Sequence, residues 1–348
     1  MTRMMRAAIF KGNGILNVEN VPVPEIRNPY DVLLQVKAAS ICGSDIHVLS
    51  VPPAQYAKPG IALGHEFVAE VVEVGSAVTT VRAGDIVVPD PIIKCGVCPD
   101  CRENRQNLCT HEDILGQKRD GGFAQYCVAP EKVLYKIPTD VPMRIAAQTE
   151  PLACVMNAVL KLNPQPGQRI VVFGAGAIGL TFIRVLRLYG ISDLVVCETD
   201  ENRQTDAKRC GADIVMNPST NDMPAALNKL WGGLADIIID AVGIGAVTQQ
   251  AIGMLDATGR LLIFGQNNNA IAQIPPAQIV RKELSVLGSY STHNSFPAAI
   301  RLLSNPDLGL ERLISHELPL ERISEGMAAV RNRTASRVII YPNDENLV

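Results

Sequence analysis

The sequence is poor in aromatic residues, in excess charge of either sign and in uncharged hydrophobic runs. Aromatic side chains make up 4% of its 348 residues, and 32 Lys and Arg face 35 Asp and Glu, for a net charge of -3. Neither a basic face nor an aromatic stacking platform is indicated, so we expect no nucleic-acid partner. The most apolar stretch, residues 170–196, contains Arg184, Arg187 and Asp193, which argue against a membrane span. The first residues lack the apolar core and cleavage site of a secretory signal, so we expect a soluble cytoplasmic protein.

The cysteines argue against a disulfide framework. There are nine, an odd number, and such frameworks are typical of short exported chains. Five stand singly, whereas four gather in the pattern Cys95-x2-Cys98-x2-Cys101-x7-Cys109. Four thiolates so closely spaced favour a closed tetrahedral zinc site with a structural role. An iron–sulfur cluster is the alternative, although the ferredoxin run continues after three residues with Cys-Pro and this one does not.

The pattern of expected strands and helices changes near residue 155, and the length of the chain suggests about two domains. Residues 5–150 read as short strands separated by Gly and Pro turns. From about 155, strand-like runs alternate with helix-length segments, which predicts an α/β fold with a doubly wound parallel sheet. The tail ends in a strand at Arg337–Tyr341 and is expected to return to the first domain. We therefore predict a β-rich domain of residues 1–155 and 290–348, and a Rossmann domain of residues 156–289.

A dinucleotide-binding turn is predicted at the start of the second domain. The buried run 170–173 is followed by glycine-rich residues and then by an apolar helix, as a βαβ phosphate site requires. Glu198 ends the next strand, about 20 residues on, where a carboxylate accepts the ribose hydroxyls of NAD and repels the 2′-phosphate of NADP. An ordinary tight turn is the alternative. The predicted NAD-binding residues are Gly174, Gly176, Ala177, Ile178, Gly179, Glu198 and the nearby Arg203.

Three short segments carry the remaining side chains that can bind a metal ion. They are Cys42-Gly43-Ser44-Asp45-Ile46-His47, Gly64-His65-Glu66 and Glu150-Pro151. Taken singly, each also fits a structural interpretation: a buried thiol, a core histidine, or an acid in the first turn of a helix. Because they occur together with a nucleotide fold and a four-cysteine loop, a catalytic metal site is favoured over these structural interpretations.

In these features the chain resembles the zinc-dependent medium-chain dehydrogenase/reductase family over nearly its whole length. The resemblance is carried by ICGSDIH, GHE, the four-cysteine loop, DGGFAQY, the glycine fingerprint and RKELSVLGSY, in this order. It implies a GroES-like catalytic domain with an inserted Rossmann domain, two zinc ions per chain and NAD as cofactor. We also expect a homodimer or homotetramer that acts on a small molecule.

The resemblance also implies roles for individual residues. Cys42 and His65 match ligands of the catalytic zinc. Glu66 matches a catalytic-site residue that ligates this zinc in some members and lies just outside its ligands in others. Glu150, also expected as a zinc ligand, stands where simple alcohol dehydrogenases carry a cysteine and where the polyol and threonine branches carry a glutamate. Ser44 matches the hydroxyl that receives the substrate proton, and His47 the imidazole that passes it on. The bound metal lowers the pKa of the alcohol, and hydride then moves to the nicotinamide.

Within the family, Thr149–Val159 and the Ser44-Asp45 pair look most like the sorbitol, galactitol-phosphate and other sugar-alcohol dehydrogenases. Ser291-Thr292 stands where sorbitol dehydrogenases carry Arg-Tyr, and Met156-Asn157 where threonine dehydrogenases carry a histidine. We therefore predict oxidation of a secondary alcohol, a polyol or its phosphate. The alternatives are an amino-polyol, inositol-type or threonine-type dehydrogenase, and a dinucleotide-binding protein without catalysis.

Overall fold

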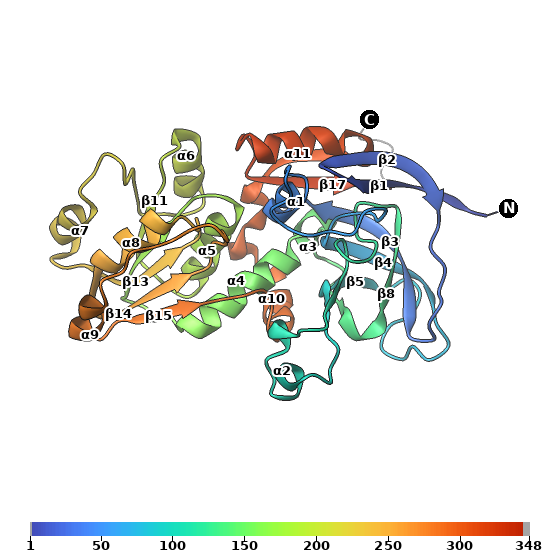
Figure 1. Ribbon diagram of the computed structural model, residues 1–348, viewed down its shortest axis with the longest axis horizontal. Helices are drawn as coiled ribbons and strands as arrows, with labels where there is room; N and C mark the ends of the chain where they lie inside the picture. The colour runs from blue at the N-terminus through green and yellow to red at the C-terminus, as the bar shows by residue number, and fades with distance from the viewer. Residues whose placement is uncertain (1, 344–348) are drawn as a thin grey trace. The chain divides into compact units, whose positions relative to one another are not determined.

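The computed structural model describes residues 2–343, which form two units (Figure 1). The first unit contains the chain up to Ala153, then Thr292–Asn305 and the chain from Ile314 onward. The second contains Cys154–Ser291 and Pro306–Leu313. Helix α4 (Thr149–Leu162) carries the chain from the first to the second. Among the described residues, no helix is both long and apolar enough to cross a membrane.

The first unit is built on a seven-stranded sheet whose strands come from both ends of the chain. Its order is β16-β17-β3-β4-β5-β9, and β8 also pairs with β3. Strand β17 pairs parallel to β16 and antiparallel to β3, with Ile339 opposite Ser40. These strands are β3 (Asp31–Ser40), β4 (Glu66–Val74), β5 (Ile86–Pro89), β8 (Tyr126–Pro130), β9 (Leu134–Lys136), β16 (Ile314–Pro319) and β17 (Arg337–Tyr341).

Smaller elements surround this sheet. Two antiparallel pairs, β1 with β2 and β6 with β7, lie outside it. Helix α11 packs against β16, β17 and the short helix α1, as Figure 1 shows. These elements are β1 (Met4–Gly12), β2 (Ile15–Pro22), β6 (Ile92–Ile93), β7 (Asp113–Ile114), α1 (Gly43–Val48), α2 (Pro99–Arg102), α3 (Met143–Ala146), α10 (Phe296–Leu303) and α11 (Ile323–Arg331).

The second unit has the predicted parallel sheet. Six strands run in the order β12-β11-β10-β13-β14-β15, and every neighbouring pair is parallel. Apolar side chains of α7, α8 and α9 share one core with its strands. The elements are β10 (Arg169–Phe173), β11 (Asp193–Cys197), β12 (Ile214–Met216), β13 (Ala235–Asp240), β14 (Leu255–Ile263), β15 (Ser285–Gly288), α5 (Ala177–Leu188), α6 (Glu201–Arg209), α7 (Met223–Trp231), α8 (Gly245–Gly253) and α9 (Pro276–Lys282). This strand order is that of a Rossmann fold.

One segment departs from the predicted division. We expected all of residues 290–348 to return to the first unit, but Pro306–Leu313 belongs to the second. The reason is Arg184 on α5, which is 9% exposed and donates to the carbonyls of Asp307 (2.5 Å) and Leu308 (2.8 Å). Its Nη1 also donates to the carbonyl of Cys210 at 2.8 Å. A buried guanidinium that needs these acceptors fixes the segment to the Rossmann unit.

Candidate metal centres and dinucleotide turn

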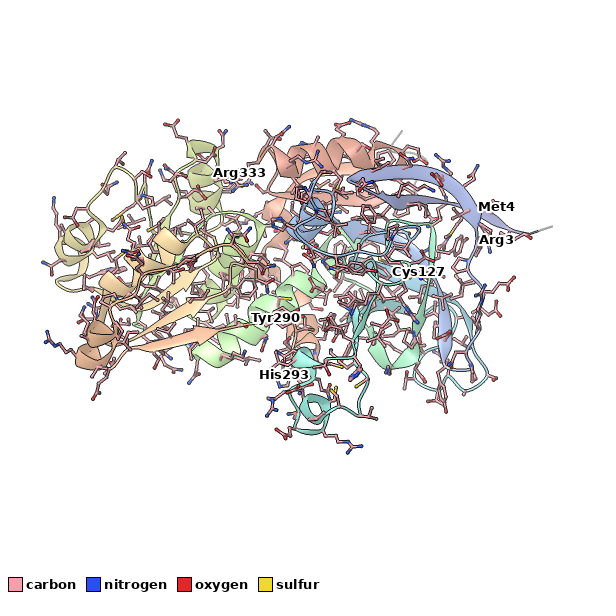
Figure 2. All side chains as sticks on the ribbon, in the orientation of Figure 1. Arg3, Met4, Cys127, Tyr290, His293 and Arg333 are labelled. Carbon is pink, nitrogen blue, oxygen red and sulfur yellow. The ribbon has the colours of Figure 1, made fainter. Side chains whose placement is uncertain are left out.

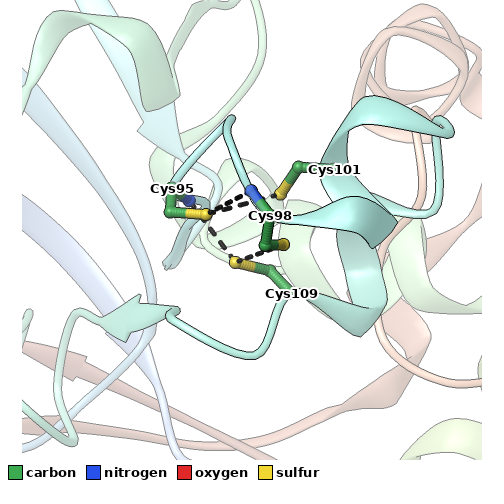
Figure 3. Close-up of side chains that lie close together, drawn as sticks. All are labelled: Cys95, Cys98, Cys101 and Cys109. Atoms are coloured by element: carbon green, nitrogen blue, oxygen red, sulfur yellow. Dashed lines mark hydrogen bonds between the residues drawn. The ribbon is translucent and has the colours of Figure 1, made fainter.

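The four clustered cysteines come together as the spacing predicts. Their Sγ atoms all lie within 4.8 Å of one another, with Cys95 and Cys101 at 3.9 Å and Cys98 and Cys109 at 3.9 Å (Figure 3). A disulfide needs about 2.05 Å between sulfurs, so these thiols are not bonded. Zn–S bonds of about 2.3 Å in a tetrahedron place neighbouring sulfurs about 3.8 Å apart. The spacing therefore fits a zinc ion at the centre.

Backbone N–H groups stabilise negative charge on this cluster. The N–H groups of Val97 and Cys98 point at the Cys95 sulfur, at 3.5 and 3.3 Å. The N–H of Val97 contributes most to lowering the pKa of Cys95. The backbone N–H of Cys101 similarly lowers the pKa of Cys98 to about 6. Zinc binds thiolates, so both effects favour the metal-bound form.

A second cluster of mixed donors forms from two separate motifs. Ligand atoms of Cys42, His65 and Glu66 lie within 4.8 Å of one another. His65 is 7% exposed and Glu66 1%, so these polar groups are buried together. Sulfur, imidazole nitrogen and carboxylate oxygen are a donor set that zinc accepts in catalytic sites. The residues present fit such a metal ion.

Asp45 positions two of these donors. It is 2% exposed, and its Oδ2 accepts the backbone N–H of Cys42 at 2.9 Å. Its Oδ1 faces Nδ1 of His65 at 3.6 Å. Nδ1 has no hydrogen-bond partner among the described residues, but the carboxylate faces it on the side of the ring opposite Nε2, where a ligating histidine usually meets a carboxylate. Ser44 Oγ lies 3.4 Å from that Nε2, so the predicted proton acceptor is at the cluster.

The backbone around His65 depends on glycine. Gly64 has φ +91, a conformation that residues with a Cβ rarely adopt. A Cβ there would also lie 2.7 Å from the ring of Phe123. The carbonyl of Gly64 accepts the N–H of Gly122 at 2.7 Å, and a Cβ on Gly121 would lie 2.0 Å from that oxygen. The DGGFAQY motif therefore packs directly on the GHE turn.

An arginine from the far end of the chain neutralises Glu66. Arg337, the first residue of β17, donates from Nη1 to Glu66 Oε2 at 2.8 Å and to Ser40 Oγ at 3.0 Å. The side chains of Arg337 and Glu66 are 2% and 1% exposed. Nε and Nη2 of the guanidinium are buried and have no hydrogen-bond partner among the described residues. A buried carboxylate needs such a charge partner.

Burial and charge shift the pKa values of Cys42 and His65 in the mixed cluster. Burial raises the pKa of Cys42, and the charge of Glu66 raises it further. Burial by itself would lower the pKa of His65, but the charge of Cys42 and the contact with Asp45 outweigh it and raise the pKa well above the usual value. The surroundings of His65 thus favour a positive charge on its ring. A metal cation bound to the ring nitrogen supplies that charge in place of the added proton.

Two of the predicted residues stand apart from this cluster. Glu150 lies in the first turn of α4, half-buried, and is not in the group of ligand atoms within 4.8 Å of one another. His47 is on α1 like Ser44, but its side chain is exposed. Their roles in metal binding and proton transfer stay predictions.

The glycine turn in the second unit joins β10 to α5. Gly174 has φ +92, and a Cβ on Gly179 would lie 1.9 Å from the carbonyl of Gly174, so helix and strand approach closely. A Cβ on Gly176 would meet only the end of Arg203, at 3.9 Å. Gly176 precedes Ala177, the first residue of α5, where backbone N–H groups are free to bind an anion. The turn can take a pyrophosphate.

Glu198 stands directly after β11 and faces this turn. Its Oε2 accepts the N–H of Ala175 at 2.9 Å, and its Oε1 accepts those of Thr199 and Asp200 at 2.7 and 3.0 Å. It is 9% exposed. A carboxylate offers about four lone-pair positions, so Oε2 retains one for a ribose hydroxyl.

Within the part of the chain that the structure describes, the singly placed cysteines other than Cys42 belong to no group of metal donors. Cys127 on β8 lies in the interior of the first unit, where Figure 2 labels it, and burial raises the pKa of its thiol. Burial likewise raises the pKa of Cys197 and of Cys210 in the second unit. These residues act as small apolar core residues.

The structure adds three residues that sequence reasoning did not assign to the site. Asp45 could have been found from its position three residues after Cys42, since an acid there can accept the N–H of the residue that precedes the helix. Ser40 and Arg337 left no such signal, because Arg337 meets Glu66 across 271 residues of sequence.

Comparison with known proteins agrees with this geometry. Residues 28–139 match the alcohol dehydrogenase GroES-like domain, and residues 177–305 match the zinc-binding dehydrogenase domain. A sorbitol dehydrogenase of Halalkalibacterium halodurans is 32% identical over 96% of this chain and 97% of its own length. A D-altritol 5-dehydrogenase of Agrobacterium fabrum is 34% identical over 92% of this chain and 94% of its own. A Sinorhizobium meliloti 1021 protein described as a zinc-binding dehydrogenase, solved with NADP bound, superposes with a TM-score of 0.93. It is 31% identical, with 98% of this chain and 100% of that one covered.

Proposed function

The chain belongs to the zinc-dependent medium-chain dehydrogenase/reductase family, and we propose that it oxidises a secondary alcohol of a polyol, or of a polyol phosphate, with NAD. The observation that carries this proposal is the cluster of half-buried Cys42 with buried His65 and Glu66, and the Ser44 hydroxyl beside it. The polyol class rests on the relatives that are named for sorbitol and D-altritol.

Different residues of the site bind the metal, transfer the proton and position these groups during alcohol oxidation. Cys42, His65 and Glu66 would hold zinc, which polarises an alcohol oxygen when bound. Ser44 Oγ accepts the proton of the substrate hydroxyl, and the imidazole of His47, on the same helix, takes it onward. Asp45 faces Nδ1 of His65, on the side of the ring away from Nε2, and Arg337 forms a buried ion pair with Glu66.

The proposed preference for NAD rests on Glu198. Its Oε2 lone pair accepts a ribose hydroxyl, whereas the 2′-phosphate of NADP would meet a carboxylate in a poorly solvated position. Arg203 lies near Gly176 and offers a positive charge at the same turn. The ratio of kcat/KM with NAD to that with NADP measures which charge dominates.

We propose assembly as a homodimer or homotetramer, which the outer strand of the second sheet supports. Among the strands of residues 2–343, β15 has a neighbour on one side only, and Val286 on it is 39% exposed. Val280 on α9 is 75% exposed. An open strand edge beside apolar side chains favours pairing with a second copy. Light scattering of the wild type and of Val286→Lys tests this: a monomeric wild type would contradict it.

The compartment is also a proposal. All nine cysteines are free thiols, and a four-thiolate zinc site requires reduced cysteines. These properties suit the reducing cytoplasm.

The test of function combines a substrate screen with metal analysis. Polyols, their phosphates and L-threonine are supplied with NAD, and NADH is followed by its absorbance. We expect turnover of one or more polyols and two zinc ions per chain. Cys42→Ser should bind NADH and retain the structural zinc without turnover. No NADH formation from any alcohol by a protein with both zinc ions would overturn the proposal.

A further inference from the structure

A cavity of about 220 Å³ in the first unit lies beside the four-cysteine loop and is not used by the proposed reaction. Three separate stretches of the chain supply its walls. Asn294, from one of these stretches, donates to Oδ1 of Asn104 on the cysteine loop at 3.2 Å. This hydrogen bond joins the stretch that contains Asn294 to the cysteine loop. Figure 2 labels His293, which directly precedes Asn294 in this wall. The lining includes Lys94, Gln106, Lys132, Tyr135, Asn294 and Ser295.

The charge in this cavity is positive. Lys94 forms an ion pair with Asp90, which also lines the cavity, so these two balance. Lys132 donates to the carbonyl of Lys94 at 2.7 Å, and no ion pair joins it to an acid among the described residues. An ammonium has three N–H donors, so Lys132 keeps two for a ligand.

A buried hydroxyl in the same cavity lacks a partner. Ser295 is 0% exposed, and its Oγ has no hydrogen-bond partner in the part of the chain that the structure describes. It directly precedes α10, yet its side chain does not cap that helix. The start of α10, with the positive end of its dipole, the Ser295 hydroxyl and Lys132 all border the same cavity. An oxygen acceptor would satisfy all three.

Tyr135 and Phe296 form a fixed wall. Their rings stack with centroids 5.1 Å apart and an interplanar angle of 15°. Burial, and then the charge of Asp90, raises the pKa of Tyr135. Its hydroxyl therefore stays protonated at neutral pH and can donate to an anion.

We propose that this cavity is a binding site for a tetrahedral oxyanion, either inorganic phosphate or the phosphate group of a small ester. Lys132 comes from one stretch of the chain and the Ser295 hydroxyl, with the start of α10, from another, and both line the cavity, which suits a ligand with several acceptor oxygens. Because Gly96 and Gln106 belong to the cysteine loop, the bound anion would also hold that loop against α10.

Calorimetry on the zinc-loaded protein with NADH at saturation tests the site, because NADH occupies the dinucleotide turn. Inorganic phosphate, glycerol 1-phosphate and acetate are titrated at constant ionic strength. We expect saturable binding of one phosphate species per chain, weakened about tenfold in Lys132→Met and in Ser295→Ala. Lys229→Met, which removes an exposed lysine of the other unit, should bind as the wild type does.

The outcomes separate the two sources of phosphate and test the site itself. Tighter binding of glycerol 1-phosphate identifies an ester as the ligand, and tighter binding of inorganic phosphate identifies the free ion. No saturable binding, equal binding of acetate, or unchanged affinity in Lys132→Met would overturn the proposal. Lys132 is exposed, so its replacement should leave the fold intact, as far-UV circular dichroism can verify. Cys42→Ser should still bind phosphate even if the proposed oxidation is wrong.

Discussion

Replacing Arg337 with Met should destabilise the first unit by leaving the Glu66 carboxylate buried without its cation. Both side chains are almost fully buried and joined at 2.8 Å. Removing one partner of such a pair typically costs about 3–5 kcal/mol. The protein can limit this cost by protonating the acid. For a carboxylic acid with an ordinary pKa of about 4.3, protonation at pH 7 costs about 3.7 kcal/mol.

This limit gives the loss of stability a distinctive pH dependence. At pH 5.5 the same protonation costs only about 1.6 kcal/mol. The difference in the free energy of unfolding between wild type and Arg337→Met, here called the gap, should therefore narrow as the pH falls. A cation held by Cys42 and His65 offsets part of the penalty, and the gap should therefore be largest in zinc-free protein. Urea denaturation at pH 7 and pH 5.5 measures it.

Two further variants separate charge from packing. Ser40→Ala removes one hydrogen bond of the same guanidinium and keeps its charge, so it should cost only about 1 kcal/mol. Adding Glu66→Gln to Arg337→Met removes the unpaired charge and should restore much of the stability. If the gap is the same at both pH values, and the second substitution restores nothing, the loss comes from packing and the electrostatic reasoning fails.

Three other changes test the remaining features. Cys98→Ser should lower zinc content from two to one per chain and reduce solubility, whereas Cys127→Ser should leave zinc content unchanged; mass spectrometry decides. Gly64→Ala forces a Cβ against Phe123 and should yield little folded protein or a Tm lowered by several degrees in calorimetry, and a wild-type Tm would contradict the close packing. Glu198→Ala should reduce the preference for NAD in kcat/KM, which equal ratios in wild type and variant would refute.

The local parts of this structure could be predicted from the sequence, and the distant pairings could not. The strand at Arg337–Tyr341 and the glycine turn follow from short patterns of β-branched residues and glycines. The four-cysteine cluster follows from spacing within one loop. Arg337, in contrast, reads as an ordinary charged residue at the start of a strand, because its partner is set by the pairing of β17 with β3. The attachment of Pro306–Leu313 to the second unit depends in the same way on one buried side chain, Arg184.

The position of β17 between β16 and β3 has a consequence for synthesis on the ribosome. Strand β3 is complete by Ser40 and its first half pairs with β8, but the strand that covers this edge at Ala39 and Ser40 is made only at Arg337–Tyr341. At about 5–20 residues per second, that edge waits some 15–60 s for its neighbour. The sheet of the second unit, which ends at Gly288, is made in full during this wait. The nascent first unit meanwhile presents an open edge and an unneutralised Glu66, so we expect the ribosome-bound chain to depend on chaperones until its last strand emerges.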